Sequence, residues 1–228
     1  MSPAGEKVTR RGVPWRVLPL LVVLREVMQE RSTTRLVRIG VDFKSWLKNP
    51  PSVEQARPGR CVQCGAASHA AGGGLTVQGH GMRARQLRGP LEPGAEPRLL
   101  DLLLRRYLCI ACGAVLTVAP KAVLPKRLFT AGAIALALAL WAVEGEPSPV
   151  VRERISPLKS VGHTAARTWL TLRRWTRDAR RIFQGVRPWP DGWPPRKVAE
   201  RVATTLASLG PAGAAIPARA FVGATRTR

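Results

Sequence analysis

The chain has little negative charge and lacks a long hydrophobic run. Its 228 residues contain 14 Asp and Glu against 37 Lys and Arg, which gives a formal net charge of +23. The apolar, uncharged stretch at residues 128–143 is shorter than the roughly 20 residues that a membrane-spanning helix needs. We therefore expect no membrane segment, a cytoplasmic location and a polyanionic partner, for which nucleic acid is the first candidate.

Cysteine is also scarce, and all four cysteines lie in two Cys-x-x-Cys-Gly motifs, Cys61–Cys64 and Cys109–Cys112. A disulfide framework is typical of short secreted chains. A thioredoxin-type redox pair usually occurs singly in a βαβ unit, and neither motif is followed by the His of a haem attachment site. Four thiolates can instead complete a closed tetrahedral shell around one structural Zn²⁺. We interpret the nearby His69 as a solvated loop residue.

The residues around the two motifs suit a metal-binding turn. Gly65 and Gly113 follow the second cysteines and tolerate the left-handed conformation that aims backbone N–H groups at the sulfurs. The segment between the motifs exceeds the about 15–20 residues usual for such pairs. We interpret the excess as an extended hairpin, with strands near 75–78, 82–87, 99–108 and 114–118. These features together predict a zinc ribbon over residues 57–122.

Residues 1–56 show no recognisable chemistry. A β-branched run predicts a strand over 16–24, and a helix is expected over 25–39. Asp42 can N-cap a helical turn over 43–47, which Pro50 ends. We interpret this N-terminal α/β unit as a cap packed on the ribbon.

After the ribbon the pattern becomes helical. Thr130 is a suitable N-cap for a helix over 131–143, and Pro149 occupies the first turn of a second helix that begins at residue 148. A third helix is expected over 163–183, with basic residues around an apolar stripe formed by Ala165, Trp169, Leu172, Thr176, Ala179 and Phe183. Three helices with a basic third one predict a helix-turn-helix-like domain over 123–187. The turn at 156–162 is longer than usual for that motif.

Residues 188–228 form a fourth, C-terminal region. Trp189 and Trp193 lie in a Pro-rich strap, which we expect to lay its indoles on the helices rather than to stack on bases. A helix over 196–209 and a basic, disordered tail over 210–228 should follow. The predicted fold class is therefore α+β: a small zinc-ribbon β-sheet flanked by a short N-terminal α/β cap and a C-terminal helix-turn-helix-like three-helix unit.

The order of the motifs resembles a known family. The first Cys motif precedes His-Gly-x-Arg-x-Arg at 80–85 and Leu-Arg-Arg-Tyr-x-Cys at 104–109. This order is similar to the N-terminal zinc ribbon of a family of bacterial insertion-sequence transposases. Leu-Pro-x-Arg at 124–127 and the helical part around Trp169 and Trp175 resemble the helix-turn-helix that accompanies the ribbon. The chain looks closest to stand-alone proteins that carry this pair of modules. The resemblance covers about residues 57–187 and implies binding to the terminal DNA of a mobile element.

The chain departs from those transposases in lacking their catalytic domain. That domain uses an acidic triad on a ribonuclease-H-like sheet to hold two Mg²⁺, whereas Asp occurs here only at positions 42, 101, 178 and 191. Two-metal phosphoryl transfer needs convergent carboxylates. We therefore predict that the chain is not an enzyme.

The leading hypothesis is a zinc-dependent protein of the bacterial nucleoid that binds double-stranded DNA, either as an accessory of a transposable element or as a derived regulator. The third helix would enter the major groove, and the ribbon would add contacts to the DNA backbone. The candidate nucleic-acid-binding residues are Arg83, Arg85, Arg105, Arg106, Arg167, Thr168, Arg173, Arg174, Arg177 and Arg181. Two alternatives stay open: an RNA-binding zinc-ribbon protein, and an adaptor that docks a separately encoded transposase or integrase.

Overall fold

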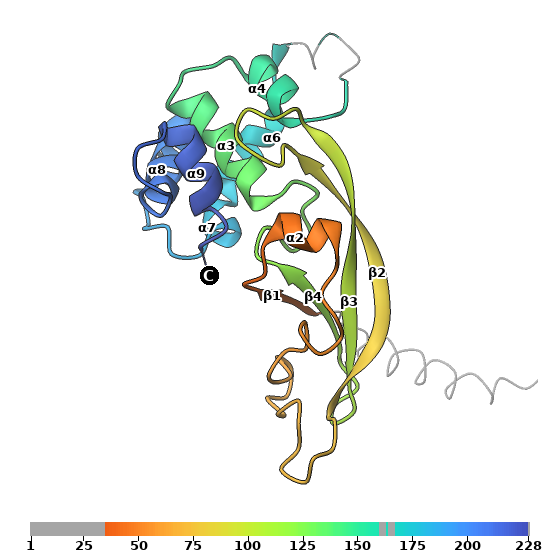
Figure 1. The fold of residues 1–228 in the computed structure, drawn as a ribbon. Coiled ribbons are helices and arrows are strands. Elements are labelled where there is room, and N and C mark those ends of the chain that lie inside the picture. Colours follow the sequence, from red (N-terminus) through yellow and green to blue (C-terminus); the bar gives the residue numbers. More distant parts are fainter. Residues whose placement is uncertain (1–34, 160–162, 164–166, 228) are drawn as a thin grey trace, which may run out of the picture.

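The computed structural model describes residues 35–159, 163 and 167–227, and places a mixed sheet beside a group of helices (Figure 1). The α+β class expected from the sequence is confirmed at this level. The predicted strand at 16–24 and most of the predicted helix at 25–39 lie outside the described residues. No helix in the described part of the chain is both long enough and apolar enough to cross a membrane.

The sheet has four strands in the order β1-β4-β3-β2. Strands β1 (Arg35–Ile39) and β4 (Val115–Pro120) are parallel, and β3 (Arg98–Cys109) is antiparallel to both β4 and β2 (Val77–Gly89). Strand β1 corrects the helix predicted over 25–39, because the last five residues of that range are extended. Their backbone pairs with residues 116–120 of β4, and such tertiary pairing overrides local helix propensity.

Strands β2 and β3 form one long hairpin that reaches from the cysteine end of the molecule to the helices (Figure 1). The strands predicted at 82–87 and 99–108 are confirmed as parts of it. Between Gly79 and Met82, β2 carries one residue more than the paired part of β3, which makes a β-bulge. Gly81 lies in this bulge with φ +80°, a left-handed conformation that suits glycine.

The buried face of the hairpin changes along its length. On β3 the buried side chains are those of Leu100, Leu102 and Leu104 near the helices, and those of Tyr107 and Cys109 near the cysteines. Alternate residues of a strand point to opposite faces, so the covered face switches between Leu104 and Tyr107. The bulge in β2 lies opposite this switch.

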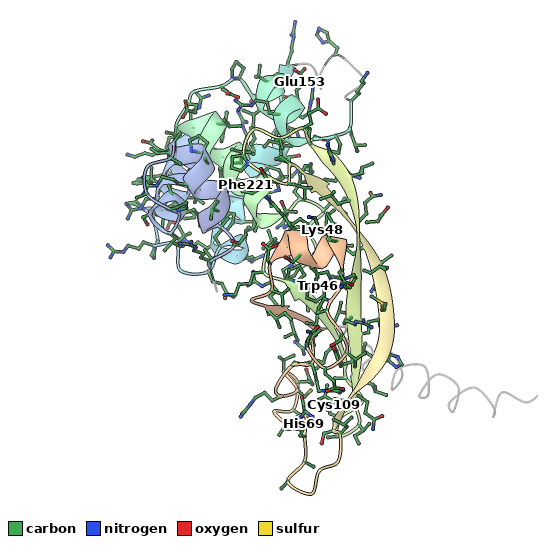
Figure 2. The ribbon with its side chains drawn as sticks, viewed as in Figure 1. Trp46, Lys48, His69, Cys109, Glu153 and Phe221 are labelled. Atoms are coloured by element: carbon green, nitrogen blue, oxygen red, sulfur yellow. The ribbon has the colours of Figure 1, made fainter. Side chains whose placement is uncertain are left out.

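Helix α2 (Phe43–Lys48) packs on the hairpin through its tryptophan. The carboxylate of Asp42 accepts a hydrogen bond from the backbone N–H of Ser45 at 2.8 Å, which confirms the predicted N-cap. Trp46 is fully buried, and its indole N–H donates to the carbonyl of Leu103 at 2.8 Å (Figure 2). Because its N–H is hydrogen-bonded, the buried indole anchors this short helix to β3.

A second core lies among the helices, and α3 (Ala131–Ala142) is at its centre. Every residue of α3 from 131 to 140 is buried, and the hydroxyl of Thr130 caps the helix by accepting from the N–H of Ala133 at 3.1 Å. Around it lie α4 (Ser148–Ile155), α6 (Leu170–Arg177), α7 (Ala179–Ile182), α8 (Pro195–Ser208) and α9 (Ile216–Gly223) (Figure 1).

Helix α9 shows that the prediction of a disordered tail over 210–228 was wrong. It packs on α3 and α8 and buries Ala220 completely. The approach to α8 is so close that a Cβ atom at Gly223 would lie 1.9 Å from the carbonyl oxygen of Leu206. The sequence of α9 is rich in small residues, which permit this close helix–helix contact, and Pro217 lies in its first turn, where proline suits a helix.

The expected continuous third helix over 163–183 is interrupted. Thr168 and Trp169 are not helical, α6 begins at Leu170, and Asp178 separates α6 from the short α7. The rings of Phe129, Trp169 and Trp175 meet edge to face with centroids 5.1–6.0 Å apart, and the carboxylate of Asp178 pairs with Arg127. These contacts with the segment before α3 hold the chain in place at the two interruptions, Trp169 and Asp178.

The predicted apolar stripe is nevertheless buried from α6 onward. Leu172, Thr176, Ala179 and Phe183 are all buried, and Trp169 packs against the helical core. Ala165 lies outside the described residues. The periodicity therefore identified the correct face although the helix is broken.

The end of β2 joins the sheet to the helices. The N–H of Arg88 donates to the carbonyl of Leu128 at 2.7 Å, and the N–H of Thr130 donates back to the carbonyl of Arg88 at 3.3 Å. Gly89, which follows, has φ +125°, and a Cβ atom there would lie 2.5 Å from the Cβ of Ala133. This junction has no room for a side chain.

We predict that Gly89→Ala destabilises the protein, because it adds a methyl group to a closed contact and strains the backbone. Overpacking alone costs about 1–3 kcal/mol, and the unfavourable φ adds to it. Chemical denaturation should show a lower midpoint. Gly94→Ala is the matched control, because Gly94 has φ +85° and no atom within 4 Å of the added Cβ. An equal effect of the two changes would remove the steric part of this explanation.

Candidate metal centre and basic surfaces

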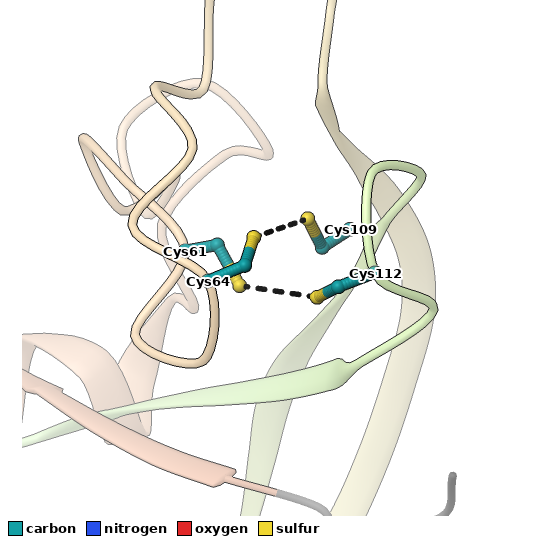
Figure 3. Close-up of side chains that lie close together, drawn as sticks. All are labelled: Cys61, Cys64, Cys109 and Cys112. Carbon is teal, nitrogen blue, oxygen red and sulfur yellow. Dashed lines mark hydrogen bonds between the residues drawn. The ribbon is translucent and has the colours of Figure 1, made fainter.

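The four cysteines come together at one end of the sheet. Cys61 and Cys64 lie in the loop before β2, Cys109 is the last residue of β3, and Cys112 lies in the turn that leads to β4. The Sγ atoms of Cys61 and Cys112 are 3.8 Å apart, those of Cys64 and Cys109 are 3.7 Å apart, and all four lie within 4.8 Å of one another (Figure 3).

These separations fit a tetrahedral thiolate shell. With metal–sulfur bonds of about 2.3 Å, the edge of such a tetrahedron is about 3.8 Å. The same separations are far longer than the about 2.05 Å of a disulfide bond, and all four cysteines are free. The donor set can therefore hold one metal ion through four sulfurs.

The two turns that carry the cysteines have the same backbone geometry. In each, the N–H of the first cysteine donates to the carbonyl of the alanine after the glycine, at 2.8 Å for Cys61 and 3.0 Å for Cys109. The glycine N–H donates back to the carbonyl of that cysteine, at 2.9 Å from Gly65 and 2.8 Å from Gly113. The two glycines have φ 76° and 72°, as their positions in the sequence predicted.

The thiols differ in how readily they ionise. Burial raises the pKa of the Cys61 thiol, but the backbone N–H groups of Cys64 and Gln63 outweigh it and lower this pKa to about 7. At Cys112 the backbone N–H of Ala114 favours the thiolate, but burial and the three neighbouring cysteines together raise the pKa to about 12. Four adjacent thiolates therefore need a bound cation to balance their charge.

His69 lies outside this group. It is exposed, and it sits at the same end of the molecule as Cys109 (Figure 2). Among the residues that the structure describes, the group of side chains that can share a metal ion consists of the four cysteines. The interpretation of His69 as a solvated loop residue agrees with this placement.

Two of the candidate arginines on the hairpin have structural hydrogen bonds. Arg105 donates from Nε to the carbonyl of Pro51 at 2.8 Å, which holds the loop before the first cysteine motif against β3. Arg85 donates from Nη2 to the carbonyls of Leu124 and Arg127 at 2.5 and 2.9 Å. Burial, and then repulsion from Arg83, lowers the pKa of Arg85. Neither role was visible in the sequence, because the acceptors are backbone carbonyls from distant segments.

Arg83 and Arg106 have more freedom to meet a ligand. Arg83 is exposed and points to the same face of the hairpin as Arg85, since both pair with even-numbered residues of β3. Arg106 is half-buried and lies opposite Thr117 of β4 on that face. A groove of about 600 Å³ runs across this part of the sheet, and Arg83 and Arg85 line it.

The helical candidates fall on two elements rather than one. Arg173, Arg174 and Arg177 are exposed on α6, and Arg181 is exposed on α7. Arg167 and Thr168 are exposed and precede α6. The structure thus brings the arginines of α6 and α7 together. Arg167 and Thr168, which were expected near base edges, lie before the first residue of α6.

Arg180 and Trp189 complete this surface and were not among the candidates. Arg180 lies over the indole of Trp189, 4.5 Å from the ring centroid, and donates to its carbonyl at 2.9 Å. Both line a groove of about 410 Å³ with Arg173 and Arg177. The spacing 173-177-180 was the signal in the sequence, since these positions share one helical face. Trp189 and Trp193 also pack against the helical core, as the strap interpretation expected.

In comparisons with known proteins, no family model, curated protein or solved structure matches this chain. The similarity to insertion-sequence transposases therefore stays a prediction from the sequence.

We predict that the purified chain holds one metal ion and that Cys64→Ser or Cys112→Ser abolishes stoichiometric binding. Each change removes one of four sulfur ligands, and the remaining three leave the shell open. Elemental analysis of the dialysed protein measures the metal content directly. His69→Ala is the control and should keep the metal. Loss of metal in that variant would place a histidine in the shell.

Proposed function

We propose that this chain is a zinc-dependent DNA-binding protein whose α6–α7 surface contacts duplex DNA. The observation that carries the proposal is a set of exposed arginines without acidic partners. None of them belongs to an ion pair within the described residues, where the pairs are Lys44–Glu92, Arg57–Glu54, Arg127–Asp178 and Arg154–Glu146. The set consists of Arg173, Arg174, Arg177, Arg180 and Arg181.

The local charge balance explains why a polyanion suits this surface. The one acidic residue between Arg173 and Arg181 is Asp178, and Arg127 neutralises it. Asp191 also lines the groove of this surface, so a single carboxylate there faces several arginines. The remaining like charges repel one another, and phosphate groups would relieve that repulsion. Each phosphate that an arginine neutralises also releases condensed counterions, which favours binding at moderate salt.

Zinc is the metal that this proposal assigns to the cysteine centre. A shell of four sulfurs in a tetrahedral arrangement suits zinc, and it leaves no coordination position for a substrate. The role of the ion would be structural: it would join the loop before β2 to the β3–β4 turn, where few apolar side chains are available. Metal-binding free energy then becomes folding free energy.

Two of the four aspartates have structural roles, which supports a binding role rather than catalysis. Asp42 caps α2, and Asp178 pairs with Arg127, so both already have structural partners. In the described part of the chain, the cysteine group is the one cluster of three or more metal-ligating side chains. We propose that the chain binds nucleic acid without cleaving it.

The link to a mobile element rests on the similarity of the sequence motifs alone. It can be tested by incubating the zinc-loaded protein with fragmented DNA from its own genome and sequencing the retained fragments. Enrichment of inverted terminal repeats is the expected result. Retention without sequence preference would leave a DNA-binding protein with no role in transposition.

We predict that Arg174→Ala weakens binding to every duplex by a similar factor and lowers the salt slope. Loss of one phosphate contact reduces the slope of log K against log salt by about 0.9. Fluorescence anisotropy at four or more salt concentrations measures it. Arg154→Ala removes the same charge, but Arg154 is paired with Glu146 and should leave the slope unchanged.

An unchanged slope for Arg174→Ala would contradict the assignment of the α6 surface. A second arm adds structured RNA as a competitor against labelled duplex DNA. If RNA displaces the duplex at much lower concentration, the protein is an RNA-binding protein and the DNA assignment is wrong.

A further inference from the structure

The groove on the sheet is cationic on its walls. Arg35 of β1, Arg83 of β2 and Lys126 line it, together with the half-buried Arg85, and none of its lining residues is acidic. Within the described residues, Arg35, Arg83 and Lys126 take part in no ion pair. The groove is therefore an uncompensated positive site, separate from the arginines of α6 and α7.

Lys126 is held in a strained conformation at the rim of this groove. Its φ is +56°, the one positive φ of a non-glycine residue in the described chain. Arg85 fixes the segment by donating to the carbonyls of Leu124 and Arg127, on either side of it. Such strain persists where surrounding contacts impose it, and it occurs often at binding sites. Arg85 thus acts as a positioning residue for Lys126.

The floor of the groove is apolar and contains one hydroxyl without a partner. Leu36, Leu104 and Leu128 contribute the apolar surface. Thr117 is 4% exposed, and its Oγ1 makes no hydrogen bond to any described residue. A buried hydroxyl without a partner is unfavourable, and this oxygen lies beneath the surface of the groove with almost no area open to a ligand.

We propose that this groove binds an unpaired strand of nucleic acid, with its phosphates at Arg35, Arg83 and Lys126 and its bases over the apolar floor. The inference rests on the proposed function, since it concerns the same class of ligand. The groove has the volume of a small-molecule pocket, which suits a short stretch of a single strand rather than a whole duplex. Proteins that hold single strands without reading their sequence use a positively charged groove along the backbone, usually with aromatic side chains under the bases. In this groove the bases would lie on aliphatic side chains instead.

The groove borders the surface assigned to duplex DNA. Lys126 precedes Arg127, and the guanidinium of Arg127 pairs with Asp178, which follows Arg177 at the end of α6. The ion pair thus brings the groove rim next to the basic helix. A strand that leaves the end of a duplex on α6 can continue into the groove without crossing an unpaired acidic side chain of this junction.

The test compares a labelled single strand of about twelve nucleotides with its blunt duplex, using the full-length, zinc-loaded protein. Arg83→Gln/Lys126→Gln removes two groove charges and keeps the aliphatic stems. Lys48→Gln/Arg60→Gln removes two exposed charges outside the groove lining and serves as the matched control. We expect the groove variant to lower the single-strand salt slope by about 0.7 for each lost phosphate contact. Its duplex slope should stay at the wild-type value.

Metal content and denaturation midpoint verify that each variant is folded. A variant that fails to fold is replaced by the corresponding single change, Arg83→Gln or Lys126→Gln.

The outcomes separate this inference from the proposed function. Two results would overturn the groove assignment and leave the α6 surface intact. One is wild-type protein that binds duplex but not single strand, and the other is a groove variant with unchanged single-strand binding. Groove-dependent single-strand binding without any duplex binding would support the groove and overturn the duplex assignment. Loss of both affinities in the control variant would show that binding follows net charge, and the groove assignment would fail.

Discussion

The pairing of β2 with β3 is the constraint on which the two ends of the molecule depend. At one end Val77 lies opposite Cys109, so the hairpin carries the second cysteine motif to the first. At the other end Arg88 exchanges backbone hydrogen bonds with the segment that leads into α3. Because backbone pairing along the strands fixes their register, the cysteine centre and the helices cannot shift independently of each other.

The two halves of the molecule are stabilised in different ways. The helical half has a core of its own around α3, where Ala and Leu side chains are fully buried. Near the cysteines the apolar side chains are fewer, and hydrogen bonds hold the loops in place. Arg105 and Tyr107 of β3 donate to loop carbonyls, and Arg57 of the loop donates to the carbonyl of Val77 in β2. A closed metal site is effective in such a region, since its binding free energy does not require a large buried area.

Local patterns in the sequence predicted what short-range chemistry determines. The cysteine spacing with its glycines, the N-caps Asp42 and Thr130, and the buried stripe from Leu172 to Phe183 all depend on residues close in the chain. The errors arose where distant residues decide. The strand at 35–39 needs β4, the ordered packing of α9 needs the close approach to α8, and the break before α6 needs Phe129. The hydrogen bonds of Arg85 and Arg105 are of the same kind, because their acceptors are backbone carbonyls that carry no signal in the sequence.

The bulge at Gly79–Met82 determines which way the arginines of β2 face. In an unbroken strand, side chains of odd-numbered residues from Val77 to Leu87 would all project to one face. The extra residue reverses this phase, so Val77 shares a face with Tyr107, whereas Arg83 and Leu87 share a face with Leu104 and Leu100. If β2 kept Gly81 but paired with β3 without the bulge, its side chains would alternate strictly from Val77 onward. Leu87 would then turn away from the core it now fills, and the arginines of the groove would project from the opposite side of the sheet. A single glycine thus couples the packing of this hairpin to the direction in which its positive charge is displayed.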